Sequence, residues 1–194
     1  MKDIPQAISQ LQLIVSFKGY MVSLKDCLEI HSEKEFYAFE PDDLKYSICS
    51  KSIPFELRLN NEYFTIKNIS KKDIIFWAID GKFLTTSKQQ RCDCAIFDDK
   101  ILCLVEFKTR SEGRTPETRE ETILHAQKQI ISTYELIKNQ IKKQGIDLLD
   151  KVTLEGHICI SKRYPRISSE EMNMQALFAE KNGFGLYFDG IKEF

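Results

Sequence analysis

The sequence lacks the features that would assign it to a membrane, secretory or modular class. Its 194 residues contain no run near the roughly 18 consecutive apolar residues of a membrane-spanning helix. The start, MKDIPQAISQ, has no apolar run behind a basic end, so we expect no secretory signal. No repeat and no linker rich in Pro, Gly or Ser divides the chain. We therefore predict one cytoplasmic domain over residues 1–194, a length that supports one hydrophobic core.

Paired cysteine motifs and an excess of charge of one sign are also missing. Six cysteines are present, but only Cys92 and Cys94 are close together, and a zinc site usually adds a second pair or nearby histidines. Disulfides are disfavoured in a reducing cytoplasm, so we expect buried thiols, with Cys92 and Cys94 on one face of a strand. The net charge of −1 neither favours nor excludes nucleic acid, because a basic strip can occur on a neutral chain.

The first third of the chain predicts helices. Apolar residues recur at helical spacing over residues 4–20 and again over 23–39, and a further helical turn is expected after Pro41. Residues 55–69 alternate apolar and polar side chains around an Asn-Asn pair, which indicates a hairpin or two short strands. Residues 74–84 are rich in β-branched and aromatic side chains and predict a strand, although their first half is also compatible with a helix.

The later part of the chain predicts alternating strands and helices. Residues 91–97 and 100–108 form two apolar strands joined by Asp98-Asp99, which predicts an antiparallel hairpin. A polar loop leads to a long helix over residues 116–143, capped by Thr115 or Thr118 and stopped by Gly145. Its inward stripe is expected to comprise Ile123, Ala126 or Gln127, Ile130, Ile131, Tyr134 and Ile137. A strand over 152–161, a helix over 170–182 and a short final strand over 183–188 follow.

Three charged residues interrupt the apolar hairpin. Asp93 belongs to its first strand, and Glu106 and Lys108 end its second strand. Charged groups are rarely buried unless they are paired or bind a metal. Residues two apart on a strand share a face, so Glu106 lies beside Lys108, and Asp93 can face them across the hairpin. The two carboxylates and the carbonyl of Phe107 make a set of hard oxygen ligands suited to Mg²⁺ or Mn²⁺.

Such a metal site predicts phosphodiester hydrolysis. The metal would lower the pKa of a bound water and polarise a phosphate oxygen. Lys108 would position that water and neutralise the charge that develops during in-line attack. The alternative is an ordinary ion pair between Glu106 and Lys108 at a strand end, with Asp93 solvated at an edge. His125, on the long helix, is expected to be a surface histidine.

Asp93, followed after a gap of twelve residues by Glu106-Phe107-Lys108, resembles the D…(D/E)-x-K signature of the PD-(D/E)XK nuclease superfamily. The proline that gives this superfamily its name is absent, because Cys92 stands before Asp93. The resemblance covers about residues 74–161. It implies a restriction-endonuclease-like α/β fold, a three-layer α/β/α domain with a central mixed sheet and core order α-β-β-β-α-β. Residues 1–52 would add an N-terminal helical extension, and residues 169–194 a helix-and-strand tail.

The same resemblance implies a set of functional residues. It implies that this chain is a DNA endonuclease or exonuclease that uses Mg²⁺ or Mn²⁺. Gln129 or Gln127, on the helix after the hairpin, would lie near the metal ion and belong to the catalytic residues. Some members add a glutamate from the first helix as a further metal ligand, and four candidates here are not separated by the sequence: Glu29, Glu33, Glu35 and Glu40. The basic residues that flank the site are candidates for phosphate contacts, namely Lys88, Arg91, Arg110 and Arg114.

The expected partners follow from how little of the chain lies outside this core. Target recognition would then need a homodimer or a larger complex with an ATPase subunit, in antiviral defence or DNA processing. One alternative is a catalytically inactive module of the same fold that acts as a scaffold or nucleic-acid-binding subunit. Another is an unrelated binding protein whose hairpin carries a surface ion pair. The presence of all three charged residues favours the enzyme, since an inactive module has no physical need for them.

Overall fold

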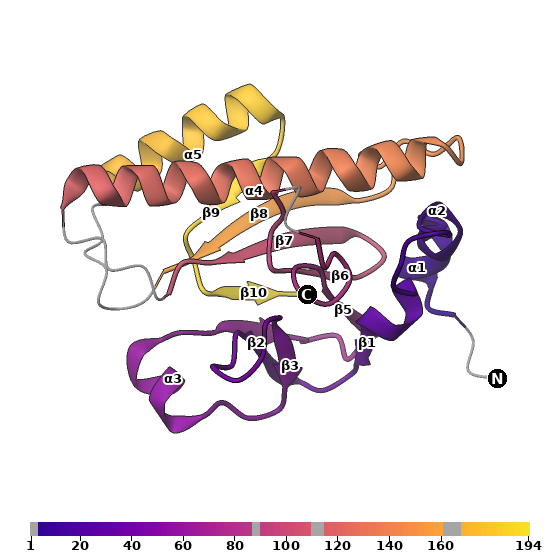
Figure 1. The fold of residues 1–194 in the computed structure, drawn as a ribbon, viewed down its shortest axis with the longest axis horizontal. Coiled ribbons are helices and arrows are strands. Elements are labelled where there is room, and N and C mark those ends of the chain that lie inside the picture. The colour runs from indigo at the N-terminus through magenta and orange to yellow at the C-terminus, as the bar shows by residue number, and fades with distance from the viewer. Residues whose placement is uncertain (1–3, 87–89, 110–114, 161–167) are drawn as a thin grey trace.

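Two sheets form the framework of the computed structural model, which describes residues 4–86, 90–109, 115–160 and 168–194 (Figure 1). The larger sheet has six strands, in spatial order β1 (Leu28–His31), β5 (Ile74–Ala78), β6 (Cys94–Phe97), β7 (Ile101–Phe107), β8 (Thr153–Cys159) and β9 (Gly185–Tyr187). The smaller sheet has four strands, in the order β10 (Ile191–Glu193), β4 (Phe64–Lys67), β2 (Glu35–Phe39) and β3 (Ile48–Ser50). Both sheets mix parallel and antiparallel pairs, so the fold is of the mixed α/β class.

The described residues also form five α-helices and one short 3₁₀ helix. They are α1 (Gln6–Gln10), α2 (Leu13–Ser16), η1 (Leu24–Cys27), α3 (Phe55–Asn60), α4 (Pro116–Lys142) and α5 (Ser168–Asn182). In the described parts of the chain, none of these helices combines the length and the apolar character that crossing a bilayer requires.

The centre of the larger sheet agrees with the sequence prediction. β5, β6 and β7 are successive antiparallel strands, and the β6–β7 hairpin turns at Asp98-Asp99. Helix α4 then crosses over to β8, which pairs in parallel with β7 along its whole length. A parallel pair needs such a crossover, because a short turn can only reverse the chain direction. The order β-β-β-α-β of the expected core is therefore present.

Helix α4 forms where the sequence predicts it. Thr115 and Thr118 together make a capping box at its start, and Gly145, in a left-handed conformation at φ 75°, follows its end. The predicted apolar stripe is buried, and its members Ile123, Ala126, Ile130, Tyr134 and Ile137 all belong to the core on this side of the sheet. Their burial fixes which face of α4 meets the sheet and, with it, where Gln129 points.

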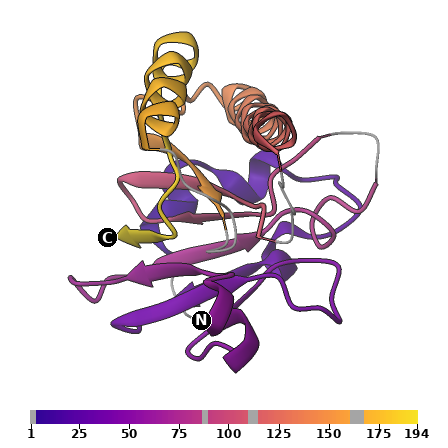
Figure 2. The same ribbon diagram turned by 90° about the vertical axis from the view of Figure 1, so that its left-hand side faces the viewer.

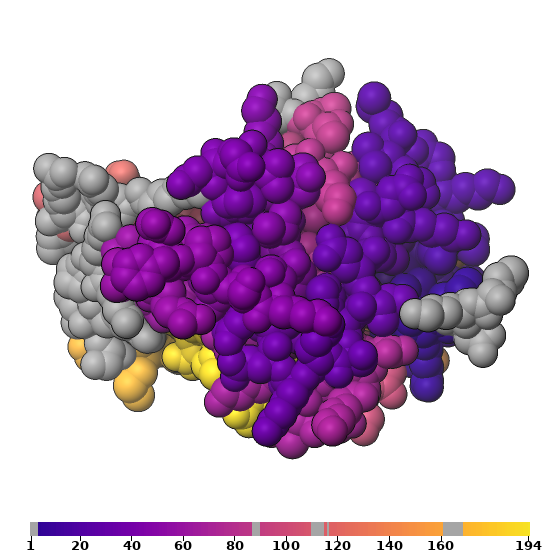
Figure 3. All heavy atoms as spheres, turned by 90° about the horizontal axis from the view of Figure 1, so that it is seen from below, coloured from indigo at the N-terminus to yellow at the C-terminus, as the bar shows by residue number. Residues whose placement is uncertain are grey.

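The expected three-layer α/β/α arrangement is wrong in its third layer. Helices α1, α2, α4 and α5 pack with one core on one face of the larger sheet. The other face is covered by the smaller sheet, so the layers are helices, sheet and sheet (Figure 2). Phe36, Phe64 and Ile66 fill this second core against Phe76 and Ile96. Seen from this side, the surface is made mainly of the N-terminal part of the chain (Figure 3).

The helical prediction for the first third is largely wrong. Residues 4–20 contain two short helices, separated at Gln12, which has a left-handed φ of 46°. Residues 23–39 hold only the 3₁₀ turn η1 and then strands β1 and β2, and no helical turn follows Pro41. In β2, Phe36 and Ala38 alternate into the core while the strand pairs on both sides, and this pairing outweighs the helical spacing.

The predicted hairpin over residues 55–69 is half wrong. Its first part is helix α3, and only its second part is a strand, β4. Asn61 adopts a left-handed φ of 59° and ends helix α3 as its C-cap, so it does not form a hairpin turn. The predicted C-terminal helix and strand are confirmed as α5 and β9, and the additional strand β10 joins the smaller sheet beside β4.

Candidate active site

Asp93 lies immediately before β6, in a segment that α4 and the end of β5 hold in place. From α4, Gln129 Nε2 donates to the Arg91 carbonyl at 2.9 Å, and Thr133 Oγ1 accepts the Cys92 N–H at 2.8 Å. The Asp93 carbonyl accepts the N–H groups of Ile79 and Asp80 at 3.0 and 3.2 Å. The backbone on the N-terminal side of Asp93 and at Asp93 itself is therefore held by contacts that do not involve the Asp93 carboxylate.

The carboxylate of Asp93 points across the hairpin to the end of β7. Its Oδ2 accepts the Phe107 N–H at 2.6 Å. Because Cys94 pairs with Val105 in the sheet register, Asp93 extends the hairpin opposite Glu106. Leu104, two residues before Glu106, belongs to the core under α4, so Glu106 faces the helix layer as well.

Lys108 joins the hairpin to α4. Its Nζ donates to Glu106 Oε1 at 2.5 Å and to Gln129 Oε1 at 2.9 Å. The Lys108 side chain is 16% exposed, whereas that of Glu106 is only 2% exposed. The four predicted residues Asp93, Glu106, Lys108 and Gln129 thus meet at one end of the larger sheet, with the lysine nearest to solvent.

Burial raises the pKa of both acidic groups of the site. Burial raises the pKa of Asp93 well above its ordinary value, and the negative charges of Glu106 and Glu40 raise it further. Burial also raises the pKa of Glu106 to about 7, although Lys108 lowers it. The metal-free site therefore holds protons that a bound cation would displace.

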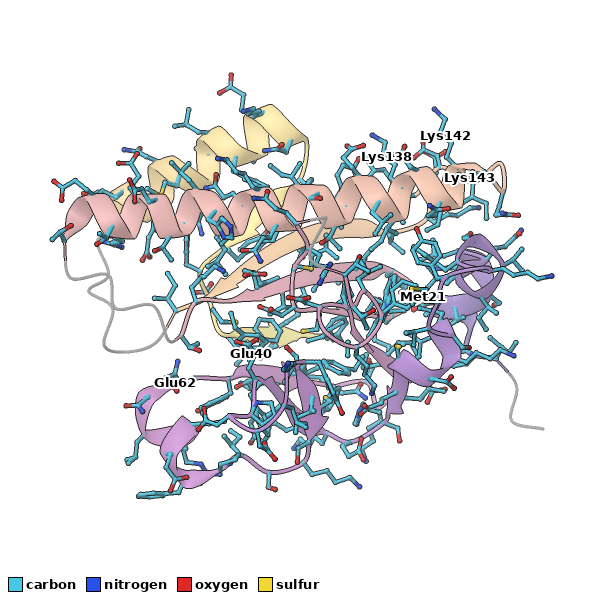
Figure 4. All side chains as sticks on the ribbon, viewed as in Figure 1. Met21, Glu40, Glu62, Lys138, Lys142 and Lys143 are labelled. Carbon is cyan, nitrogen blue, oxygen red and sulfur yellow. The ribbon has the colours of Figure 1, made fainter. Side chains whose placement is uncertain are left out.

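Glu40 is the glutamate that the structure brings to this site. It follows the end of β2 and lies between the smaller sheet and the larger one in Figure 4. Its charge raises the pKa of both Asp93 and Glu106, which separates it from Glu29, Glu33 and Glu35. In the described parts of the chain, Glu40 does not form a compact three-carboxylate cluster with them. The resemblance implied a glutamate from a helix, whereas Glu40 comes from the end of a strand.

The donor set fits a hard divalent cation. Within the described structure, Glu106 Oε2 is buried and has no hydrogen-bond partner. A buried carboxylate oxygen without a partner is costly, and a Mg²⁺ or Mn²⁺ ion would satisfy it. Asp93 offers a second carboxylate, while the carbonyl of Phe107 stays a predicted third ligand.

The remaining predicted residues are distributed as follows. Gln127 is half-buried and lies about 200° around the helix from Gln129, so Gln129 is the glutamine of this site. Arg91 is largely buried, and its Nε donates to Asp80 Oδ1 at 2.6 Å, which anchors the segment before Asp93. Its role in phosphate contact stays a prediction. The other candidates for that role, Lys88, Arg110 and Arg114, lie outside the described residues.

Lys108 borders an open groove at the start of α4. The groove is lined by Lys108, Thr118, Glu121, Thr122 and His125. His125 is exposed there, as expected of a surface histidine. Lys108 lines this groove, whereas the carboxylates of Asp93 and Glu106 are buried and do not.

Two features of the hairpin were missed or misassigned from the sequence. Thr133 is 1% exposed and holds the Cys92 N–H, and its position one helical turn after Gln129 was an available signal. Cys92 and Cys94 do not share a face, because Cys92 precedes the strand and packs in the core under α4, whereas Cys94 packs against the smaller sheet. Five of the six cysteines are buried thiols that form no disulfide, namely Cys27, Cys92, Cys94, Cys103 and Cys159, whereas Cys49 is partly buried.

Comparisons with known proteins add no family assignment. No protein-family model matches the chain, and neither a curated protein nor a solved structure is significantly similar to it. The interpretation of function therefore depends on the contacts described above and on the D…E-x-K pattern of the sequence.

Proposed function

We propose that this chain is a metal-dependent nuclease that hydrolyses phosphodiester bonds, with DNA as the favoured substrate. One observation carries the proposal: Lys108 is held between Glu106 and Gln129 at the same sheet end where Asp93 and Glu106 meet. An ordinary surface ion pair does not account for this arrangement, because Glu106 is 1% exposed and one of its oxygens has no partner among the described residues.

The order of elements supports assignment to the PD-(D/E)XK superfamily. The three antiparallel strands, the crossover helix and the parallel fourth strand follow the order expected for that core. Asp93 directly precedes β6, Glu106 lies in β7 with Lys108 directly after that strand, and Gln129 lies on α4, as the resemblance implies. The second sheet, in place of an outer helical layer, would make this chain a divergent member of that superfamily.

Each residue has a distinct role in the proposed reaction. Asp93 and Glu106 would hold Mg²⁺ or Mn²⁺, which lowers the pKa of a bound water and polarises the phosphate. Lys108 presents an ammonium group at the groove, where it neutralises negative charge that develops on the phosphate. Gln129 is a positioning residue, because it orients Lys108 through Oε1 and holds the Arg91 carbonyl through Nε2.

The proposal is tested by cleavage assays with Mg²⁺ or Mn²⁺ on supercoiled, linear duplex and single-stranded DNA and on single-stranded RNA. Wild-type protein should cleave at least one DNA form and lose this activity in EDTA. Lys108→Ala should reduce the rate by about 10²–10³, the usual effect of removing one charge-stabilising donor. Lys100→Ala is the matched control, since Lys100 is an exposed lysine at the other end of the same hairpin.

The outcomes separate the enzyme from its alternatives. Equal activity in Lys108→Ala and wild type would overturn the assignment of this site. Metal binding without cleavage of any substrate would identify an inactive module of the same kind, acting as a scaffold or a nucleic-acid-binding subunit. We further propose that the active form is a homodimer or a subunit of a larger complex. Sedimentation of the full chain with and without duplex DNA tests the dimer.

A further inference from the structure

A second polar cluster lies on the opposite face of the larger sheet, between the two sheets. Cys103 on β7 pairs in register with Glu155 on β8, and His157 lies two residues further on the same face. Cys103 Sγ is 3.7 Å from Glu155 Oε2, and His157 Nε2 is 3.1 Å from the same oxygen. The three candidate ligand atoms all lie within 4.8 Å of one another.

We infer that Cys103, Glu155 and His157 bind a transition-metal ion of the Zn²⁺ type. The site is separate from the proposed nuclease centre and does not depend on it. One thiolate, one imidazole and one carboxylate are the ligand types of zinc sites, whereas Mg²⁺ is bound through oxygen alone. On binding, the Cys103 thiol releases its proton to solvent, and His157 binds as the neutral imidazole.

The spacing of the ligand atoms fits a tetrahedral ion. Zinc lies about 2.3 Å from sulfur and about 2.0 Å from imidazole nitrogen or carboxylate oxygen, which places S and O about 3.5 Å apart and N and O about 3.3 Å apart. The separations found here are 3.7 and 3.1 Å. The two separations that involve Glu155 Oε2 are therefore each within about 0.2 Å of the tetrahedral values, and the third lies within 4.8 Å.

The surroundings leave one oxygen of Glu155 available to the ion. Lys192, on β10 of the smaller sheet, donates to Glu155 Oε1 at 2.7 Å, and Oε2 faces the cysteine and the histidine. Such an outer partner orients a ligating carboxylate. The His157 ring lies edge-on to Phe64 and stacks with Tyr187, both at 5.1 Å between centroids.

The site is largely buried, although the Glu155 side chain is 12% exposed. Cys103 is 0% exposed and His157 is 2% exposed. An ion bound here would link β7 to β8 in the larger sheet. Glu155, one of its ligands, is also bonded to Lys192 on β10 of the smaller sheet. Three side chains supply ligands among the described residues, so a water would complete the tetrahedron.

Cobalt substitution tests the inference with a signal that requires sulfur. Metal-free protein titrated with Co²⁺ should develop a near-ultraviolet thiolate-to-cobalt absorption band, and one equivalent of Zn²⁺ should remove it. An excess of Mg²⁺ should not, because Mg²⁺ does not compete for a thiolate. Cys103→Ala and Cys103→Ser should both lose the band. Their Zn²⁺ affinity should fall by more than about 100-fold. Losing a residue that only hydrogen-bonds to a metal ligand already costs about 10–100-fold, and Cys103 would be a ligand itself.

Cys94→Ala is the matched control. Cys94 is also 0% exposed and packs in the same core between the sheets. Its replacement by alanine removes a thiol, as Cys103→Ala does. This variant should keep the band, as should Glu106→Gln, which alters the nuclease centre alone. Absence of the band in wild type would overturn the inference, and so would its persistence in both Cys103 variants. In either case the cluster is a hydrogen-bonded ion pair between His157 and Glu155, with the thiol as a weak donor.

Discussion

The two faces of the larger sheet carry polar clusters of opposite chemical character. Toward the helices, Asp93 and Glu106 supply carboxylate oxygens, and Lys108 adds a cation beside a groove. Toward the smaller sheet, Cys103, Glu155 and His157 combine sulfur, oxygen and nitrogen in a largely buried cluster. Strand β7 contributes to both clusters, because residues an odd number of positions apart point to opposite faces.

The difference between the two clusters lies in how their charges are satisfied. Glu155 has two partners, Lys192 and His157, and its pKa is about 2 despite the opposing effect of burial. Glu106 has one charged partner, and burial raises its pKa to about 7. A buried carboxylate whose pKa is strongly raised is a candidate for a functional site, whereas ion-pair partners account for the lowered pKa of Glu155.

The largest expected effect is the loss of DNA cleavage when the cluster on the helix-covered face is changed and the cluster on the opposite face is not. Asp93→Asn should reduce Mg²⁺-dependent DNA cleavage by more than about 100-fold, because removing even one charge-stabilising group from an active site costs about 10²–10³. The asparagine carbonyl can still accept the Phe107 N–H, so the fold should persist. Gel assays measure the cleavage, and the cobalt–thiolate band reports the opposite face. Loss of that band in Asp93→Asn would show that the two clusters are not independent.

The second prediction concerns the pH dependence of the metal-free protein. The pKa of Glu106 is about 7 in the folded state and 4.5 ordinarily, so the folded protein keeps a proton that the unfolded chain releases. The free energy of unfolding should therefore fall as pH rises from 4.5 to 7, by about 3 kcal/mol. Urea denaturation in EDTA across this range measures it, and Mg²⁺ should restore stability above pH 7.

Glu106→Gln should remove most of this decline, since the glutamine does not titrate. A smaller decline should persist, because the pKa of Asp93 is also raised. Glu135→Gln is the control, as Glu135 is a half-exposed glutamate on α4 that pairs with Lys138. An unchanged decline in Glu106→Gln would show that Glu106 is ionised in the folded protein at neutral pH.

Sequence reasoning succeeded where local signals and packing agree. The β6–β7 hairpin has a turn motif between two apolar runs, and α4 has a capping box and a stripe of buried residues. The first third has no such agreement. The apolar spacing of residues 23–39 fits a helix, and pairing with other strands makes part of this segment strands: β1 pairs with the distant β5, and β2 pairs with β4 and with the nearer β3.

The candidate site was predictable in part for the same reason. Asp93, Glu106 and Lys108 are conspicuous because charged residues rarely occur in buried strands. Glu40 was one of four equivalent candidates, because its approach depends on how the smaller sheet packs. The pairing of Cys103 with Glu155 depends on the β7–β8 register, which spans a crossover of more than forty residues. Sequence spacing contains no trace of that register.

The smallest predicted effect concerns Thr133, which supports the helix-covered face without touching the carboxylates. Thr133→Val keeps the shape of the side chain but leaves the buried Cys92 N–H without its partner. An unsatisfied buried donor costs about 1–3 kcal/mol, so the free energy of unfolding should fall by that amount. Urea denaturation measures the loss, and hydrogen exchange should show faster opening at the Cys92 amide.

Thr122→Val separates this effect from the general cost of valine in a helix. Thr122 is on the same helix, and its hydroxyl also donates to the carbonyl four residues earlier, but it is only partly buried and holds no N–H of another segment. Its replacement should change stability by less than about 0.5 kcal/mol, as is usual for surface substitutions. Equal losses in both variants would mean that α4 contributes packing alone to the segment before Asp93. A larger loss in Thr133→Val would instead show that the hydrogen bond between α4 and Cys92 stabilises the segment that positions the Asp93 carboxylate.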